Sequence, residues 1–144
     1  MKQVLFCAVL ALFVETAFGH GGIVSSSTDG NGRFEYVVEN LNNVVDLDDI
    51  VLLIAYDNAG IYLAEGPANW SANISASETV FVANDPIAYL TPGSQATFVL
   101  YSEYTHSTYQ WHPGWGIDRF GNDIIIRNSL VLVPASEPDF GRQY

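Results

Sequence analysis

The sequence predicts an all-β fold: one antiparallel β-sandwich of about seven or eight strands, preceded by a signal peptide. Apolar residues recur at alternate positions or in short runs of strand length, and turns rich in Asn, Asp, Gly and Pro separate these runs. Hydrophobic residues make up 49% of the chain, which is enough for one packed core. We therefore expect a single domain over residues 20–134 and a solvated tail over residues 135–144.

The first nineteen residues have the pattern of a cleaved signal peptide. Lys2 provides the positive start, Val4 to Val14 form an apolar run, and Ala17-Phe18-Gly19 places small residues where a signal peptidase reads them. This run is too short to remain as a membrane span, and no later stretch is long and apolar enough. We expect the mature chain to begin near His20 and to be secreted or held at the cell surface.

The strands are predicted from alternation and from β-branched content. Phe34, Tyr36 and Val38 alternate with Glu35, Val37 and Glu39, after a turn at Asp29–Gly32, which suits a half-buried strand. Ile50 to Tyr56 is a buried run, and we expect Ile61 to Ala64 to pair back on it as a hairpin. Residues 41–49 are expected to form a loop or a short helical turn. The remaining expected strands are Thr79–Val82, Ala96–Tyr101 and Asp123–Val133, the last interrupted at Arg127-Asn128-Ser129 by a bulge or a hairpin.

Charge and cysteine content exclude several classes of function. Loss of Lys2 and Glu15 with the signal peptide leaves the net charge at −11, with four arginines and no lysine. Such an acidic chain repels a phosphate backbone, so nucleic-acid binding is not expected. The only cysteine, Cys7, lies in the signal peptide, so the mature chain has no disulfide and no thiolate chemistry.

Several motifs occur in an order similar to that of an exported bacterial module. Phe34 to Asn40 resembles its "aromatic-x-Tyr-x-Val-x-Asn" strand, and Pro67-Ala68-Asn69-Trp70 resembles its "Pro-x-x-Trp" element. Leu90 to Ser94, followed by Phe98 to Ser102, is similar to its "Leu-x-Pro-Gly-Ser … Phe-x-Leu-x-Ser" hairpin. The module is common in surface proteins sorted by the PEP-CTERM/exosortase system. The resemblance implies a β-sandwich at the cell surface. Val133 to Pro138 only echoes the family's Val-Pro-Glu-Pro signature, so we expect this copy to lack the sorting tail.

An aromatic segment is the strongest candidate for a binding site. Tyr104, Tyr109, Trp111 and Trp115, with Tyr101 just before them, fall within fifteen positions among histidine, amide and carboxylate side chains. Aromatic rings stack on sugar faces while neighbouring polar groups bond the hydroxyls, so this segment could bind glycan. The interpretation that we favour is that Trp111 and Trp115 cap the open end of the sandwich and complete its core, because His112 to Gly116 also has the pattern of a folded loop packed on itself.

Metal sites are the next candidates. A mature N-terminus at His20 would place an α-amine beside an imidazole, and His106 or His112 could add a second imidazole to bind Cu²⁺. The acidic turns at Asp29–Asn31, Asp46–Asp49 and Gly121–Asp123 offer oxygen ligands to Ca²⁺. Since none of them matches an EF-hand loop, solvated turns are the alternative, and no obligatory cofactor is expected.

The sequence therefore predicts a non-catalytic secreted or cell-surface module with a structural or adhesion function. No Gly-x-Ser-x-Gly motif appears, and no other catalytic pattern is visible, so we do not expect an enzyme. The partners that we expect are other copies, bound through strand edges, or extracellular polysaccharide. Ile124 to Ile126 and the stretch from His20 to Ser27 are the strands expected to be shared. A carbohydrate-binding module and a small copper protein are the alternative functions.

Overall fold

The computed structural model describes residues 21–40, 46–52, 60–76, 78–118, 120 and 123–137, and it confirms the predicted all-β fold. In this part of the chain there are nine strands, slightly more than predicted, and one short 3-10 helix. No helix here is long and apolar enough to cross a membrane. The elements are β1 (Gly21–Thr28), β2 (Arg33–Asn40), β3 (Leu47–Leu52), β4 (Ile61–Glu65), β5 (Trp70–Ile74), β6 (Thr79–Ala83), η1 (Pro86–Ala88), β7 (Gln95–Ser102), β8 (His106–Asp118) and β9 (Asp123–Ala135).

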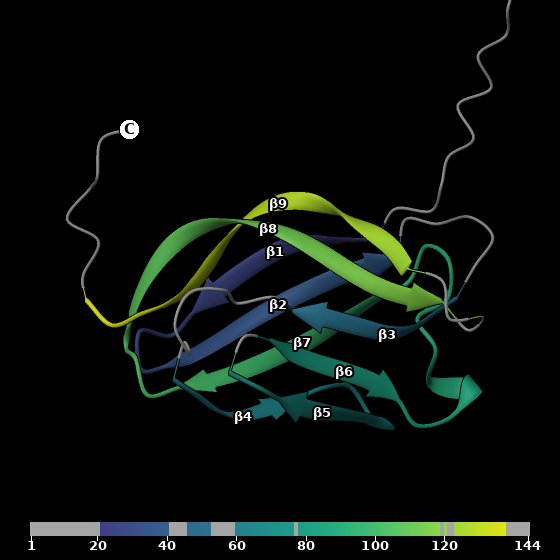
Figure 1. Cartoon of the computed structure of the whole chain (residues 1–144), viewed down its shortest axis with the longest axis horizontal. Coiled ribbons are helices and arrows are strands. Elements are labelled where there is room, and N and C mark those ends of the chain that lie inside the picture. Colours follow the sequence, from purple (N-terminus) through teal and green to yellow (C-terminus); the bar gives the residue numbers. More distant parts are fainter. Residues whose placement is uncertain are drawn as a thin grey trace, which may run out of the picture.

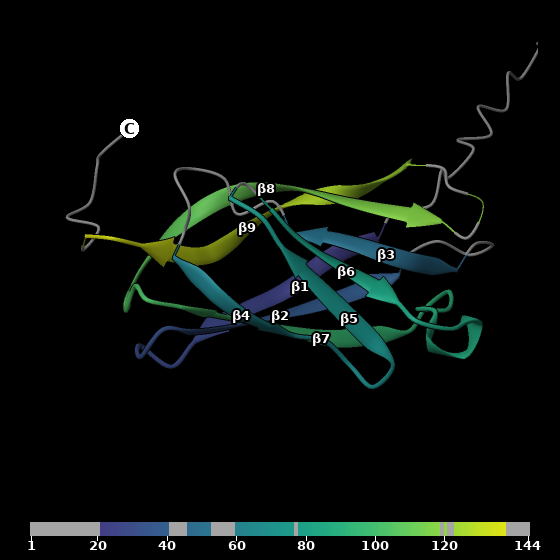
Figure 2. The same cartoon turned by 60° about the horizontal axis from the view of Figure 1, so that its bottom comes forward.

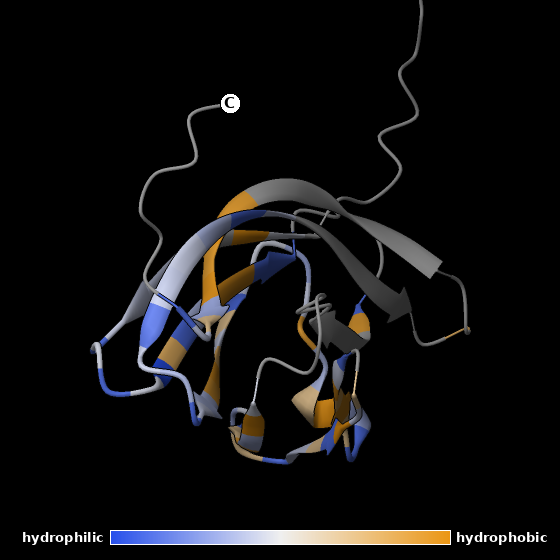
Figure 3. Ribbon diagram, turned by 60° about the vertical axis from the view of Figure 1, so that its left-hand side comes forward, coloured by the Kyte–Doolittle hydropathy of each residue, from blue (hydrophilic) through white to orange (hydrophobic). Residues whose placement is uncertain are grey.

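The strands form two layers around one core, in the order β4-β7-β2-β1-β9-β8-β3-β6-β5 (Figures 1 and 2). Strands β4, β7, β2 and β1 make the first layer, and β9, β8, β3, β6 and β5 make the second. All neighbours pair antiparallel except β1 and β9, which meet in parallel at Gly22 and Arg127. The layers curve around a common interior (Figure 3).

Strand β2 shows why the sequence forms this core. Its residues alternate between half-buried and buried, and Phe34, Tyr36 and Val38 are all almost completely buried. The turn before β2 contains Gly30 and Gly32, whose positive φ angles of 74° and 92° suit glycine. The expected alternation and the expected turn are therefore both confirmed.

Aromatic rings join the two layers inside the core. The ring of Phe98 on β7 lies 4.8 Å from that of Phe81 on β6 and packs edge-on against Trp70 at 5.3 Å. The Nε1 group of Trp70 also donates a hydrogen bond of 2.8 Å to the carbonyl of Ala88. Interlocking aromatic contacts of this kind add stability beyond the apolar area they bury.

The main-chain pairing of β1 with β9 is described at one position, and side chains of β1 and β2 add further hydrogen bonds to the main chain of β9. The hydroxyl of Tyr36 donates to the carbonyl of Leu132 at 2.9 Å, and the N–H of Leu132 donates to Oγ of Ser26 at 2.9 Å. The N–H and the C=O of Leu132 on β9 are therefore both hydrogen-bonded to side chains of the first layer. Burial raises the pKa of the Tyr36 phenol above its ordinary value of 10.0, so it remains a donor.

The expected hairpin between Ile50 to Tyr56 and Ile61 to Ala64 is wrong. Strand β3 spans Leu47–Leu52 and pairs with β6 and β8, whereas β4 pairs with β7 in the other layer. The chain therefore crosses between layers after β3. The expected loop over residues 41–49 is also shortened, because β3 already begins at Leu47; residues 41–45 lie outside the described residues.

The segment around the aromatic residues is strand. Strand β8 runs from His106 to Asp118 and pairs with β9 along almost its whole length. The register shifts between His112 and Gly114, opposite Arg127 and its neighbours, which confirms the expected bulge in β9. Pro113 lies at this irregularity, where a missing N–H costs no regular ladder bond.

The strands expected to be shared with other copies are central ones. Strand β9, which contains Ile124 to Ile126, pairs with β8 and β1, and β1 pairs with β2 and β9. The pairing of β9 with β1 is described at one position only, so the sharing of these strands with other copies stays a prediction. Residues 1–20, including the predicted signal peptide, and residues 138–144 of the predicted tail lie outside the described residues.

Candidate functional site

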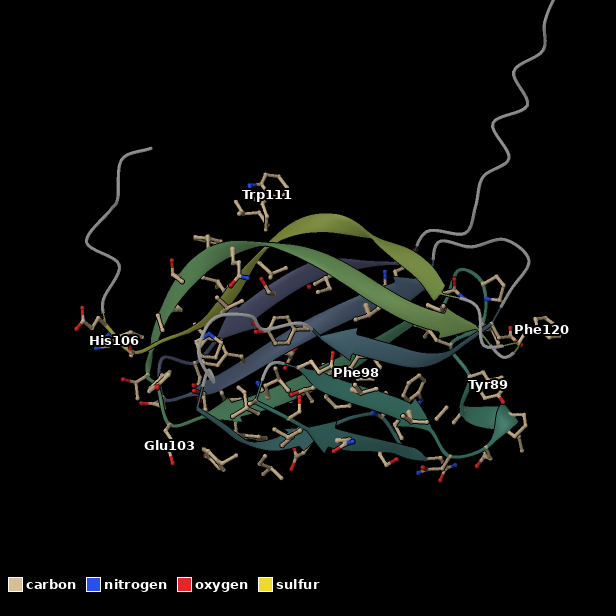
Figure 4. All side chains as sticks on the ribbon, viewed as in Figure 1. Tyr89, Phe98, Glu103, His106, Trp111 and Phe120 are labelled. Atoms are coloured by element: carbon tan, nitrogen blue, oxygen red, sulfur yellow. The ribbon has the colours of Figure 1, made fainter. Side chains whose placement is uncertain are left out.

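Tyr109, Trp111 and Leu130 form an exposed apolar patch, here called the aromatic surface. The exposed fractions of these side chains are 64%, 66% and 51%, respectively. Figure 4 shows Trp111 projecting away from the ribbon of β8. Side chains with this much exposure add little to the core, so the favoured interpretation, in which Trp111 caps the sandwich, is wrong.

The register of β8 and β9 creates this patch. Tyr109 lies opposite Leu132, and Trp111 lies opposite Leu130, so all four side chains belong to one face of the ribbon. Val131 and Val133 alternate with these leucines and are buried in the core. Because strand residues two positions apart lie on the same face and are separated by about 7 Å, the two rings stand beside each other along β8.

The outer face around the aromatic surface carries no charge among the described residues. Its other members on β8 and β9 are Ser107 and Leu132, which are half-buried, and Pro134, which is buried. The neighbouring strand β1 contributes exposed hydroxyls at Ser25 and Ser27. A chain with a net charge of −11 therefore presents a neutral face here, combining aromatic rings with hydroxyl groups.

The other predicted glycan-binding residues lie apart from this patch or cannot be placed. Tyr104 is half-buried in the connection between β7 and β8, where its N–H donates to Oγ of Ser102 at 2.9 Å. The backbone of Trp115 lies between Ile125 on β9 and Val51 on β3, but its side chain is outside the described residues. Sequence reasoning missed Leu130, which joins the patch only through the bulged β8–β9 register.

Tyr101 belongs to a separate polar cluster on the first layer. Its hydroxyl donates to Oε2 of Glu65 at 3.0 Å, and its ring centroid lies 6.4 Å from that of Tyr62. Nearby, Arg33 forms an ion pair of 2.7 Å with Glu35, and this hydrogen bond raises the pKa of Arg33. These polar groups already bond one another on the surface, so the cluster has fewer free hydrogen-bonding groups to offer a ligand than the aromatic surface has.

The histidines predicted to bind copper are not gathered in the described structure. His106 is exposed at the start of β8 (Figure 4), and His112 lies six residues along the same strand. Six strand residues span about 20 Å, so these two side chains cannot share one ion within a single copy. His20 lies outside the described residues, and no cluster of three or more candidate metal ligands occurs within them. Copper binding stays a prediction.

The acidic turns predicted to bind calcium are placed only in part. In the turn before β2, Oδ1 of Asp29 accepts from the N–H groups of Asn31 at 2.8 Å and Arg33 at 3.1 Å. The bond from Asn31 contributes most to lowering the pKa of this carboxyl. Asp29 therefore acts as the acceptor that closes its turn. Asp46 precedes β3, the backbones of Asp48 and Asp49 are part of β3, and Gly121 and Asn122 are outside the described residues.

The residues that carry the family resemblance serve as framework. Besides Tyr36 and Trp70, whose hydrogen bonds hold the layers, Asn40 is completely buried, and its Nδ2 donates to the carbonyl of Leu90 at 2.7 Å. The main chain of Asn40 also bonds to Gly93 and Ser94 of the following turn. The hydrogen bonds of Tyr36, Trp70 and Asn40 therefore stabilise the fold. The aromatic surface remains the candidate site.

Comparison with known proteins adds no assignment. No family model matches the sequence, and no curated protein matches it, so the resemblance to the PEP-CTERM module stays a prediction. A crystal structure of an uncharacterized protein from Nocardia farcinica, described as having an immunoglobulin-like fold, overlaps with a TM-score of 0.46 and 9% identity. The overlap covers 74% of this chain and 81% of that chain. A similarity this low carries no conclusion, and the fold described above is established by the strand pairings.

Proposed function

We propose that this chain is an exported, non-catalytic adhesion module that binds uncharged extracellular polysaccharide through the aromatic surface. The observation that carries the proposal is the pair of rings of Tyr109 and Trp111, exposed side by side on the outer face of β8. Export is supported by the apolar N-terminal run and the small residues that follow it.

The chemistry of the surface favours a sugar polymer. Aromatic rings present apolar faces that stack on the C–H faces of sugar rings, and large exposed apolar patches commonly mark interaction sites. Two rings in a row along one strand suit an extended polymer, which contacts several positions along the strand at once. Ser107 on β8 and Ser25 and Ser27 on the adjoining strand β1 supply hydroxyls that can bond sugar hydroxyls at the margin.

The charge of the chain favours an uncharged polysaccharide over an acidic one. With a net charge of −11, the protein repels uronate- or sulfate-bearing polymers over distances of about one Debye length. Within the described part of the outer face, no lysine or arginine accompanies Tyr109 and Trp111 to offset this repulsion. We therefore expect binding to neutral polymers to depend only weakly on salt concentration.

Affinity electrophoresis in gels containing soluble neutral polysaccharides tests the proposal. Neutral β-glucan, xylan and galactomannan are the probes, and the mature protein should be retarded by at least one of them. Trp111→Ala and Tyr109→Ala should abolish the retardation, while changing stability by no more than about 1 kcal/mol because both side chains are exposed.

Tyr62→Ala is the matched control. Tyr62 is a tyrosine with 62% exposure, close to that of Tyr109, but it lies on β4 in the other layer. This variant should be retarded like the unmodified protein. Equal loss of retardation in Tyr62→Ala and Trp111→Ala, or no retardation of the unmodified protein by any of the probes, would refute the assignment.

A further inference from the structure

The ends of the strand order identify where this sandwich has open edges. Among the described strands, β4 pairs only with β7 and β5 pairs only with β6, whereas every other strand has a partner on each side over at least part of its length. The main-chain N–H and C=O groups along an unpaired edge are a template for a further strand. Proteins usually protect such edges with charges, bulges or prolines, so the two edges can be compared on that basis.

The edge at β4 is protected. Its register shifts between Ile61 and Leu63, which leaves Tyr62 as the extra residue of a bulge. Glu65 places a carboxylate at the end of the strand, where the hydroxyl of Tyr101 holds it at 3.0 Å. A bulge and a fixed charge both oppose continued pairing.

The edge at β5 has none of these protective features. Its sequence, Trp-Ser-Ala-Asn-Ile, contains no charge and no proline, and its register with β6 is unbroken from Trp70 to Ile74. Ser71, Ala72 and Asn73 are all exposed. An exposed apolar side chain, Val82, lies on the paired strand β6.

The hydrogen bonds at the two ends of the β5–β6 hairpin show which main-chain groups face outward. The N–H of Asn84 donates to Asn69 at 2.7 Å, and the N–H of Ser75 donates to Glu78 at 2.8 Å. Since bonded pairs alternate along an antiparallel ladder, Ser71 and Asn73 direct their main-chain groups to β6. The N–H and C=O groups of Ala72 and Ile74, and the C=O of Trp70, therefore point away from β6. These groups are called the open edge below.

We infer that the open edge of β5 binds the same edge of a second copy of this chain. An antiparallel pairing centred on Ala72 is symmetric, so each copy brings the donors and acceptors that the other needs. In this register Ala72 faces Ala72 of the second copy, Trp70 faces Ile74, and Ser71 faces Asn73. No like charges meet across the ladder, which matters for two copies that each carry a net charge of −11.

Pairing through β5 leaves the aromatic surface open. Strand β5 ends the second layer, whereas Tyr109 and Trp111 lie on β8, with β3 and β6 between them. A dimer would therefore carry two copies of the aromatic surface. Two sites on one particle raise the apparent affinity for a long polymer without any new contact, provided that both sites can reach it. The dimer itself does not depend on polysaccharide binding.

Sedimentation equilibrium over a range of protein concentrations tests this inference. The mature protein should show a reversible monomer–dimer equilibrium. Ala72→Pro removes the outward N–H while leaving the ladder to β6 intact, and the symmetric pairing loses that bond twice. Its dissociation constant should rise by roughly tenfold or more.

A second pair of variants keeps the test decisive if Ala72→Pro does not fold. Asn73→Lys adds a lysine to the edge strand, a natural device against edge pairing, and should also weaken the dimer. Thr97→Lys adds the same charge to an exposed position on β7, which pairs on both sides, and should leave the dimer unchanged. Monomeric protein at every attainable concentration, or a dimer unaffected by Asn73→Lys, would overturn the inference. Retardation in polysaccharide gels is scored separately, and monomeric variants should retain it.

Discussion

Replacing Tyr36 with phenylalanine is expected to weaken the contact between the two layers. The ring of Tyr36 is almost completely buried, and phenylalanine keeps that ring in the core while removing only the hydroxyl. The carbonyl of Leu132, which accepts from this hydroxyl at 2.9 Å, then loses its donor in a partly buried position. Leaving such an acceptor unsatisfied costs about 1–3 kcal/mol, and we expect the lower half of this range because the site is only partly buried.

The loss should appear as a shift in the unfolding transition. For a domain of this size, 1 kcal/mol corresponds to a change in Tm of about 4 °C, so Tyr36→Phe should melt roughly 4–8 °C lower. Chemical denaturation followed by tryptophan fluorescence gives the free energy directly, with an unchanged m-value if the unfolding remains two-state. Tyr101→Phe is the control, because it removes a hydroxyl whose bond to Glu65 is exposed, and it should cost less than about 0.5 kcal/mol.

Equal stabilities for Tyr36→Phe and Tyr101→Phe would refute this account of the contact between the layers. Ser26→Ala adds an independent check on the same position. It removes the acceptor of the Leu132 N–H, so it should also destabilise the fold. The two substitutions act on one peptide position and should therefore be non-additive in a double-mutant cycle.

Two further predictions concern the fold. Burial raises the pKa of the Tyr36 phenol in the folded state, so its contribution to stability is fully present below about pH 10 and is lost as the pH rises through the folded-state value. Denaturation midpoints measured from pH 8 to 12 should therefore fall less in Tyr36→Phe than in the unmodified protein. An identical decline in both proteins would contradict this. Gly32→Ala should destabilise far more than Gly30→Ala, because an added Cβ at Gly32 would collide with the carbonyl of Ser102, whereas the space around Gly30 is open and only the positive φ is strained. Thermal melts of both variants decide the comparison, and equal Tm values would count against the described turn.

The parts of the fold that could be predicted are those set by local pattern. Phe34, Tyr36 and Val38 alternate with Glu35, Val37 and Glu39, and a strand with this largely alternating pattern has one buried face in a sandwich. Gly30 and Gly32 are predictable in the same way, because the turn requires positive φ. Pairing partners were harder to predict, because neighbours in the chain need not be neighbours in a sheet. Strand β4 pairs with β7, about forty residues away, and this defeated the hairpin expectation.

The aromatic segment shows a second limit. Pro113, Gly114 and Gly116 are ordinary signals for a loop, yet pairing with β9 and β3 on both sides makes this segment a strand. Tertiary pairing therefore overrides local propensity here. Whether Trp111 belongs to the core or to the surface depends on the register with β9, which a bulge shifts. For the same reason, Leu130 could not be assigned to the site from sequence alone.

The central claim, that Tyr109, Trp111 and Leu130 form the contact surface, is tested most directly by mapping amide chemical shifts during titration with a neutral polysaccharide that retards the protein. Shift changes should concentrate at residues 107–111 and 130–132, with smaller changes at Ser25 and Ser27 on the adjacent strand. Changes concentrated on Tyr62 and Tyr101 in the other layer would show that the polymer binds elsewhere and would contradict the claim.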